Sequence, residues 1–169
     1  MRYLLLFLFS LSLISVRAQT KKDDSKDDCL VVVGSFNNKK KVDDIWAYLY
    51  QDNTRIDSMK ISSKKGFQFI LKTGKNYAIL VSKGGYYNRM IRLSTILPAG
   101  VIPKPVFLFG FKTEMIPVKI SVDDYWLDFP VAQVIYDSIL KDFGYNKKYT
   151  KTIREELEKL DLLKYSKGK

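Results

Sequence analysis

Short apolar runs separated by turn residues recur along the chain after residue 28, and they constrain its fold more than any other feature. Within most runs hydrophobic and polar residues alternate, which gives a β-strand one buried face and one outer face. We expect seven strands at 29–36, 45–51, 55–61, 67–72, 77–82, 88–94 and 106–112, and a less regular eighth at 115–120. Such spacing predicts a mainly β protein, a seven- to eight-stranded β-sandwich.

Alternation also predicts which side chains form the core. The runs at 67–72 and 77–82 are expected to pair as a hairpin, with Gly66 and Gly74 in turns that need positive φ. Three phenylalanines at alternate positions of the run at 106–112 indicate a further core face. The predicted core residues are Phe67, Phe69, Leu71, Tyr77, Ile79, Val81, Phe107, Phe109 and Phe111.

The C-terminal part differs in character. Residues 130–140 fit either a short strand or the start of a helix, because the run is too short for its periodicity to decide. Ile153, Leu157 and Leu160 repeat at helical spacing, and Thr152 with Glu155 fits a capping box. These patterns predict an amphipathic helix over about 150–163.

The N-terminus indicates export. A short basic start precedes an almost wholly apolar stretch at 3–16, and Val16 and Ala18 occupy the small-residue positions of a signal-peptidase site. The stretch is shorter than the roughly 20 residues of a membrane-spanning helix, the alternative interpretation. We expect a signal peptide at 1–18 cleaved after Ala18, a flexible charged leader at 19–28, a sandwich at 29–121 and a C-terminal extension at 122–169 packed on it. The mature protein is then periplasmic or extracellular.

The chain is basic, with 29 Lys and Arg against 18 Asp and Glu and a formal charge of +11. This excess favours anionic partners, although nucleic acid is not expected for an exported protein. The lysine-rich turns form a candidate anion-binding patch of Lys39, Lys40, Lys41, Lys64 and Lys65, whereas the alternative is simple solvation of loop lysines.

The absence of histidine excludes Ser-His-Asp and Cys-His catalysis and the usual zinc sites. Cys29 is the sole cysteine, so no intramolecular disulfide forms, and we expect its side chain to be buried in a strand. Asp43 and Asp44 are interpreted as charge-paired turn residues because no calcium-loop spacing surrounds them. We therefore expect no cofactor, no metal and no enzymatic activity.

An aromatic row is the most informative candidate site. In the run at 45–51, Ile45, Ala47 and Leu49 share one face and Trp46, Tyr48 and Tyr50 share the other. Ile70 and Leu80 also point away from their own core faces, so the outer surface is too apolar to face solvent alone. Either the C-terminal helix lies over it, or a glycan or a partner protein binds there.

The order Gly66-Phe67-x-Phe69, Gly74, Tyr77-x-Ile79-x-Val81 and Gly85-Tyr86 resembles the carboxypeptidase regulatory-like domain, a transthyretin-like β-sandwich. The resemblance covers residues 42 to about 93, and the chain as a whole is similar to small secreted proteins of Bacteroidota. The Asp-x-x-Gly turn usual in that family is here Ser63-Lys64-Lys65-Gly66. The resemblance implies a non-catalytic scaffold, often an accessory of cell-envelope proteins, and it implies no ligand.

These observations together predict a non-catalytic secreted or cell-envelope module that binds a partner protein or supports an envelope assembly. The alternative is a carbohydrate-binding module that uses the row of Trp46, Tyr48 and Tyr50.

Overall fold

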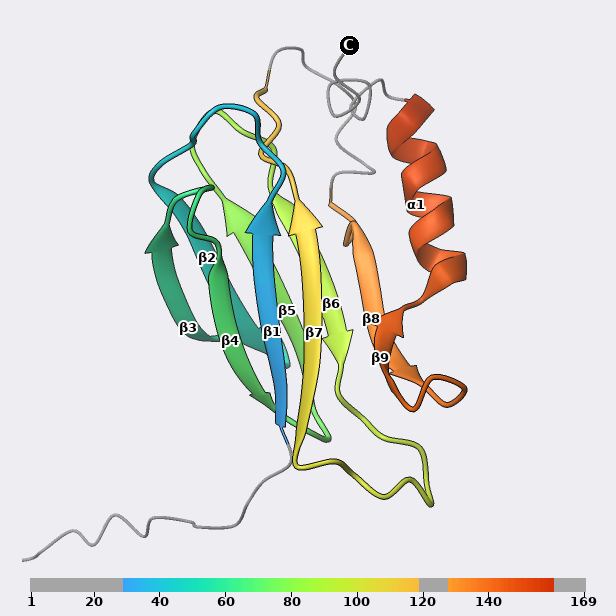
Figure 1. Cartoon of the computed structure of the whole chain (residues 1–169). Helices are drawn as coiled ribbons and strands as arrows, with labels where there is room; N and C mark the ends of the chain where they lie inside the picture. Colours follow the sequence, from blue (N-terminus) through green and yellow to red (C-terminus); the bar gives the residue numbers. More distant parts are fainter. Residues whose placement is uncertain (1–28, 119–127, 160–169) are drawn as a thin grey trace, which may run out of the picture.

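The computed structural model describes residues 29–118 and 128–159, and within them the chain is mainly β, as predicted. Two mixed sheets face each other in a sandwich-like arrangement, and one helix follows near the C-terminal end (Figure 1). The elements are β1 (Cys29–Phe36), β2 (Ile45–Gln51), β3 (Thr54–Ile61), β4 (Phe67–Lys72), β5 (Asn76–Ser82), β6 (Arg89–Ser94), β7 (Val106–Thr113), β8 (Ala132–Asp137), β9 (Asp142–Tyr145) and α1 (Lys147–Lys159).

The two sheets differ in width. The smaller has the order β4-β1-β7, with β1 antiparallel to β4 and parallel to β7. The larger has the order β3-β2-β5-β6-β8-β9, in which only β6 and β8 pair in parallel. Three strands therefore face six.

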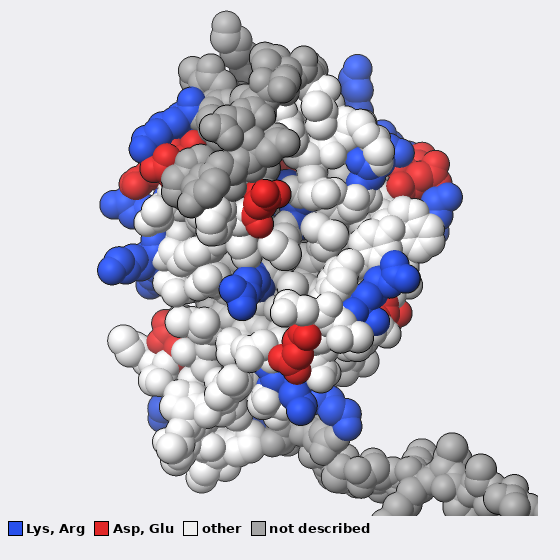
Figure 2. Space-filling model, turned by 180° about the vertical axis from the view of Figure 1, so that it is seen from behind, with Lys and Arg blue, Asp and Glu red and all other residues white. Residues whose placement is uncertain are grey.

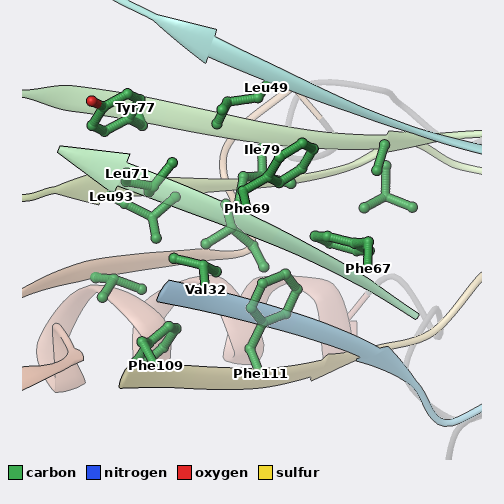
Figure 3. Packing of buried hydrophobic residues seen from close by; sticks show 14 of the residues in the cluster. Val32, Leu49, Phe67, Phe69, Leu71, Tyr77, Ile79, Leu93, Phe109 and Phe111 are labelled. Atoms are coloured by element: carbon green, nitrogen blue, oxygen red, sulfur yellow. The ribbon is translucent and has the colours of Figure 1, made fainter. Parts of the chain in front are cut away.

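The core lies between the sheets, and all nine predicted core residues are buried. Phe67, Phe69 and Phe111 of the smaller sheet face Leu49, Ile79 and Leu93 of the larger (Figure 3). The rings of Phe67 and Phe111 meet edge to face at 5.6 Å. Burying each such side chain stabilises the fold by about 1.5–3 kcal/mol.

The predicted hairpin of 67–72 and 77–82 is wrong, because β4 and β5 belong to different sheets. Both strands still present core faces, but those faces meet across the sandwich instead of lying side by side. Thr95 holds the short crossing between them: its Oγ1 lies 2.9 Å from the carbonyl oxygens of Lys72 and Lys75, which share its single O–H as donor, and it accepts from the Lys75 N–H at 3.0 Å.

Gly66 has the positive φ that the sequence predicted, at 67°. A Cβ at this position would lie 2.3 Å from the carbonyl oxygen of Gly34, so the backbones of the two glycines approach too closely for any side chain. The turn before β4 thus depends on glycine for two separate reasons.

The segment predicted as an eighth strand forms none in its described part, residues 115–118. Met115 and Ile116 are buried, and Pro117, which has no N–H to donate, makes only a single bridge to Tyr86. Residues 119 and 120 lie outside the described ranges. Two strands come instead from the C-terminal part, where the ambiguous run forms β8 and pairs with β6 and β9. Residues 132–145 are therefore continuous with the larger sheet.

Helix α1 begins at Lys147, about one turn before the predicted start. The predicted capping box is wrong: Asn146 caps the helix, its Oδ1 accepting from the Tyr149 N–H at 3.2 Å, whereas Thr152 lies inside and donates to the Lys148 carbonyl at 3.2 Å. Ile153 and Leu157 are buried as expected, and Leu160 lies outside the described residues.

The predicted signal peptide and leader also lie outside the described residues. Within residues 29–118 and 128–159, no helix is long and apolar enough to cross a membrane.

Candidate functional site

The aromatic row lies on the outer face of the larger sheet. Trp46 is 39% exposed, and Tyr48 and Tyr50 are partly buried. The rings of Trp46 and Tyr48 are nearly parallel, at 6°, with centroids 5.8 Å apart. The guanidinium of Arg55 lies 5.5 Å from the centroid of the Tyr48 ring. The two stacked rings form a small platform flanked by a cation.

The expected cover of this row by the C-terminal helix is wrong, because α1 packs on the other side of the sheet. Its buried Ile153 and Leu157 contact a cluster with Tyr87 and Ile116. Figure 1 shows α1 beside β8 and β9, on the side of the smaller sheet. Figure 2 shows the molecule from behind, where uncharged residues occupy much of the surface and most charged side chains lie toward the edges.

A second apolar surface, which the sequence did not predict, lies on the outer face of the smaller sheet. Ile70, Val31 and Leu108 pair directly across β4, β1 and β7, and Ile70 and Leu108 are 67% and 70% exposed. We call Val31, Val33, Ile70, Val106 and Leu108 the aliphatic face. Its signal was present in the sequence: Val106 and Leu108, which alternate with the core phenylalanines of β7, are also apolar. Ile70 therefore does not extend the aromatic row.

The structure brings the lysine-rich turns to one end of the molecule. The Val42 N–H donates to Ser63 Oγ and the Ser63 N–H donates to the Val42 carbonyl, both at 2.8 Å, so the two turns lie side by side. All five lysines of the candidate patch are exposed, and Lys41 pairs with Asp43 at 3.0 Å. Asp44 pairs with Lys60 at 2.8 Å, so the interpretation of Asp43 and Asp44 as charge-paired residues is confirmed.

The cysteine prediction is only partly right. Cys29 begins β1, but its side chain is partly exposed because it lies on the outer face of the smaller sheet, in register with Lys72 and Val106.

A groove of about 590 Å³ lies between the inner face of the larger sheet, the end of β7 and α1. The sheet contributes Arg89, Ile91 and Ala132, and α1 contributes side chains along one side. We call this site the polar groove. Its charged lining residues are Arg89, Lys112, Glu114, Lys147, Lys151 and Arg154.

Arg89 is the most unusual residue of the polar groove. It is only 7% exposed, and its Nε and Nη1 atoms have no hydrogen-bond partner. Burial lowers the pKa of Arg89 from its ordinary value to about 10, and the charge of Glu114 opposes the shift. A change of that size corresponds to a cost on the order of 3 kcal/mol for keeping the guanidinium charged. The side chain nevertheless stays cationic at neutral pH.

The other buried side-chain atoms without a partner belong to the same site. Among the described residues, the four such atoms are Nε and Nη1 of Arg89 and the hydroxyl oxygens of Thr113 and Thr150, and all three residues line the polar groove. Buried polar atoms are nearly always hydrogen-bonded in native proteins. These atoms are therefore concentrated at one place, the polar groove.

Hydrogen bonds hold the walls of the groove in place. On one side the Asn38 amide pairs with both backbone groups of Met115, at 2.9 and 3.0 Å, and the Asn37 N–H donates to the Thr113 carbonyl at 2.8 Å. On the other side, the Tyr149 hydroxyl donates to the Pro130 carbonyl at 2.8 Å, and the Asn146 backbone N–H donates to the Gln133 backbone carbonyl at 2.8 Å. The groove is therefore a fixed feature of the fold.

Among the described residues, Glu114 is the one carboxylate that lines the groove. Burial raises the pKa of Glu114, and the positive charges of Arg89 and Lys39 oppose that shift. Lys39 of the predicted anion-binding patch thus lies near enough to the groove to act on it electrostatically. In the described ranges no cluster of three or more metal-ligating side chains forms.

The sequence contains one signal for Arg89, although the predicted core and candidate sites did not include this residue. In the run Arg89-Met90-Ile91-Arg92-Leu93, alternation places Arg89 on the same face as Ile91 and Leu93, both of which are buried. A cation at a core-facing position indicates a buried charge that needs a partner.

Comparisons with known proteins add no family: no protein-family model matches the chain, and no curated protein matches it.

Proposed function

We propose that the chain is a non-catalytic, exported module that binds a partner protein through the aliphatic face. We also propose that the scaffold of this module is a transthyretin-like sandwich of the carboxypeptidase regulatory-like kind. The single observation that carries it is the row of Ile70, Val31 and Leu108, which crosses all three strands of the smaller sheet with its end members about two-thirds exposed. Exposed apolar patches of this kind mark interaction surfaces.

The positive charges beside the aliphatic face favour a different protein as the partner over a second copy of this chain. Lys72 and Lys112 lie on the same outer face as the aliphatic row, at the ends of β4 and β7. The partner we expect has an aliphatic centre and an acidic rim. A second copy of this chain would bring basic rims together in a protein whose Lys and Arg residues already outnumber its Asp and Glu, which disfavours self-association.

Site-specific photo-crosslinking tests this function directly. A photoreactive residue replaces Leu108, and in a control it replaces Ile139, which is even more exposed to solvent, at 92% against 70%, but lies in the β8–β9 turn. In the cells that make the protein, we expect one discrete crosslinked protein from position 108 and none from position 139. Leu108→Lys, combined with a crosslinker at Val33, should abolish that product.

Two results would contradict the proposal. Crosslinks from position 108 only to further copies of the chain would identify the face as a self-association surface. No specific crosslink from positions 33, 70 or 108 would mean that the aliphatic face has no partner.

Carbohydrate binding is a second candidate, supported by the parallel rings of Trp46 and Tyr48 on the outer face of the larger sheet. Flat, exposed rings suit stacking on a sugar. Glycan-array binding that is lost in Trp46→Ala but kept in Ile56→Ala would support this function, and an array without binding would remove it.

A further inference from the structure

The polar groove combines a buried cation, unpartnered hydroxyl groups and an excess of positive charge. We propose that it binds a small ligand bearing a phosphate or carboxylate group, with the guanidinium of Arg89 as the main contact. Apart from Lys112, which lies at the end of β7 and borders both surfaces, this site shares no residue with the aliphatic face, and it does not depend on the proposed partner protein.

Arg89 carries the argument because its free nitrogens match one class of ligand. A guanidinium presents its N–H groups as a planar fork, which pairs with two oxygens of a phosphate or a carboxylate. Here Nε and Nη1 have no partner although the residue is 7% exposed. A buried charge without a partner destabilises a protein, so a bound oxyanion would remove a cost that the empty groove carries.

The hydroxyl groups add donors of the right kind. Thr113 at the end of β7 and Thr150 on α1 line the groove from different walls, and both hydroxyl oxygens are buried without partners. Each hydroxyl can donate to a ligand oxygen. Tyr145 also lines the groove, and burial raises the pKa of its phenol, which is therefore a neutral donor at pH 7.

The charge balance excludes a cationic ligand. Five basic side chains line the groove against the single carboxylate of Glu114, and Lys151 also lies 3.7 Å from Glu155 of the same helix. Clefts lined by one sign of charge concentrate ligands of the opposite sign.

The size of the groove indicates more than a bare ion. At about 590 Å³ it falls within the roughly 300–1,000 Å³ range of sites for small organic ligands. Ile91, Ala132 and Leu157 supply apolar lining. The ligand we expect has an anionic group at Arg89 and an uncharged body against these residues.

Isothermal titration and thermal unfolding of the full chain test the proposal with two probes, inorganic phosphate and citrate, each against sodium chloride at matched ionic strength. We expect saturable binding and a rise in Tm with at least one probe, because a ligand that binds only the folded state stabilises it. If only phosphate binds, the ligand is a phosphorylated compound. If only citrate binds, the ligand is a carboxylate.

Variants locate the binding. Arg89→Met should raise the Tm without ligand, because it removes an unpartnered buried charge, and should abolish the response to the effective probe. Lys64→Gln, which removes the same charge from an exposed turn residue that does not line the groove, should leave the response unchanged. If Arg89→Met does not fold, the double variant Lys112→Gln with Arg154→Gln replaces it, and we expect at least about tenfold weaker binding from the loss of two charge-assisted contacts.

The proposal is overturned if neither probe binds beyond the sodium chloride control. It is also overturned if the groove variants respond as strongly as Lys64→Gln does, since the anions would then bind elsewhere on the basic surface.

Discussion

The two halves of the inner face of the larger sheet are covered in different ways. Over β2 and β5, the smaller sheet supplies aromatic rings that fill the space, as in the contacts of Phe67 with Phe69 and Phe111, both at 5.6 Å (Figure 3). Beside β7, over the β8 end of the sheet, α1 supplies two buried apolar side chains, Ile153 and Leu157, and a row of charged ones. The first half is a packed core and the second contains the polar groove.

The difference follows from strand number. Strands lie about 4.8 Å apart within a sheet, so three strands cannot cover six. Helix α1 covers part of the larger sheet that the smaller sheet leaves open, and an amphipathic helix contacts a sheet only along its narrow apolar face. The space beside this face is lined by side chains from the strand ends and from the polar flank of the helix. A width mismatch between layers thus leaves room for a site without weakening the main core.

The largest expected difference in stability is between truncating a buried residue under the smaller sheet and truncating one under α1. Phe69→Ala should lower the free energy of unfolding by about 3–5 kcal/mol, because the ring is 3% exposed and leaves a cavity that the facing sheet cannot fill. Leu157→Ala should cost less, about 2 kcal/mol, because the helix can move toward the groove. Urea unfolding measures both, and equal losses would show that the helical half is packed as tightly as the other.

Two buried threonines sharpen the comparison. Thr95→Val should cost about 1–3 kcal/mol, because the Lys75 N–H loses its acceptor and the carbonyls of Lys72 and Lys75 lose the hydroxyl as a donor. Thr113→Val should cost nothing or stabilise the fold by about 1 kcal/mol, because its hydroxyl has no partner to lose. The same urea experiment compares them. A clear loss of stability in Thr113→Val would mean that the Thr113 hydroxyl already has a hydrogen-bond partner in the protein without ligand.

The helix cap tests how firmly the wall of the groove is held. Asn146→Ala should lower stability by about 1 kcal/mol, because the Tyr149 N–H loses its acceptor. Asn88→Ala, at an exposed position before β6, serves as the control and should have little effect. Thermal unfolding distinguishes the two, and similar Tm values for both variants would contradict the capping role.

The smallest effect concerns pH. Burial raises the pKa of Glu114 above its ordinary value of 4.5, so its ionisation costs folded stability. A raised carboxyl pKa means that this contribution is fully present below the unfolded pKa and is lost as pH rises through the folded pKa. Relative to Glu114→Gln, the wild-type protein should therefore lose stability as pH rises from the ordinary carboxyl pKa of 4.5 through the raised pKa of the folded protein. Urea unfolding across that range would show the opposite trend if attraction to Arg89 outweighed burial.

Strand positions and core faces were largely predictable because both depend on local alternation. The predicted bounds of β1, β2 and β4 agree with the structure, and the three phenylalanines of β7 are buried. Alternation specifies which side of a strand is apolar, and burial then follows in any sandwich that pairs apolar faces.

Strand partners were not predictable in this way, because they depend on contacts between residues far apart in the chain. β4 and β5 are separated by one short turn, yet the structure places them in different sheets, with Thr95 holding the crossing. Likewise β8 could be assigned only through its pairing with β6, since its short apolar run suits a helix equally well. The polar groove arises from both effects: Arg89 occupies a core-facing position by local alternation, and only the assembled layers determine that no strand covers it.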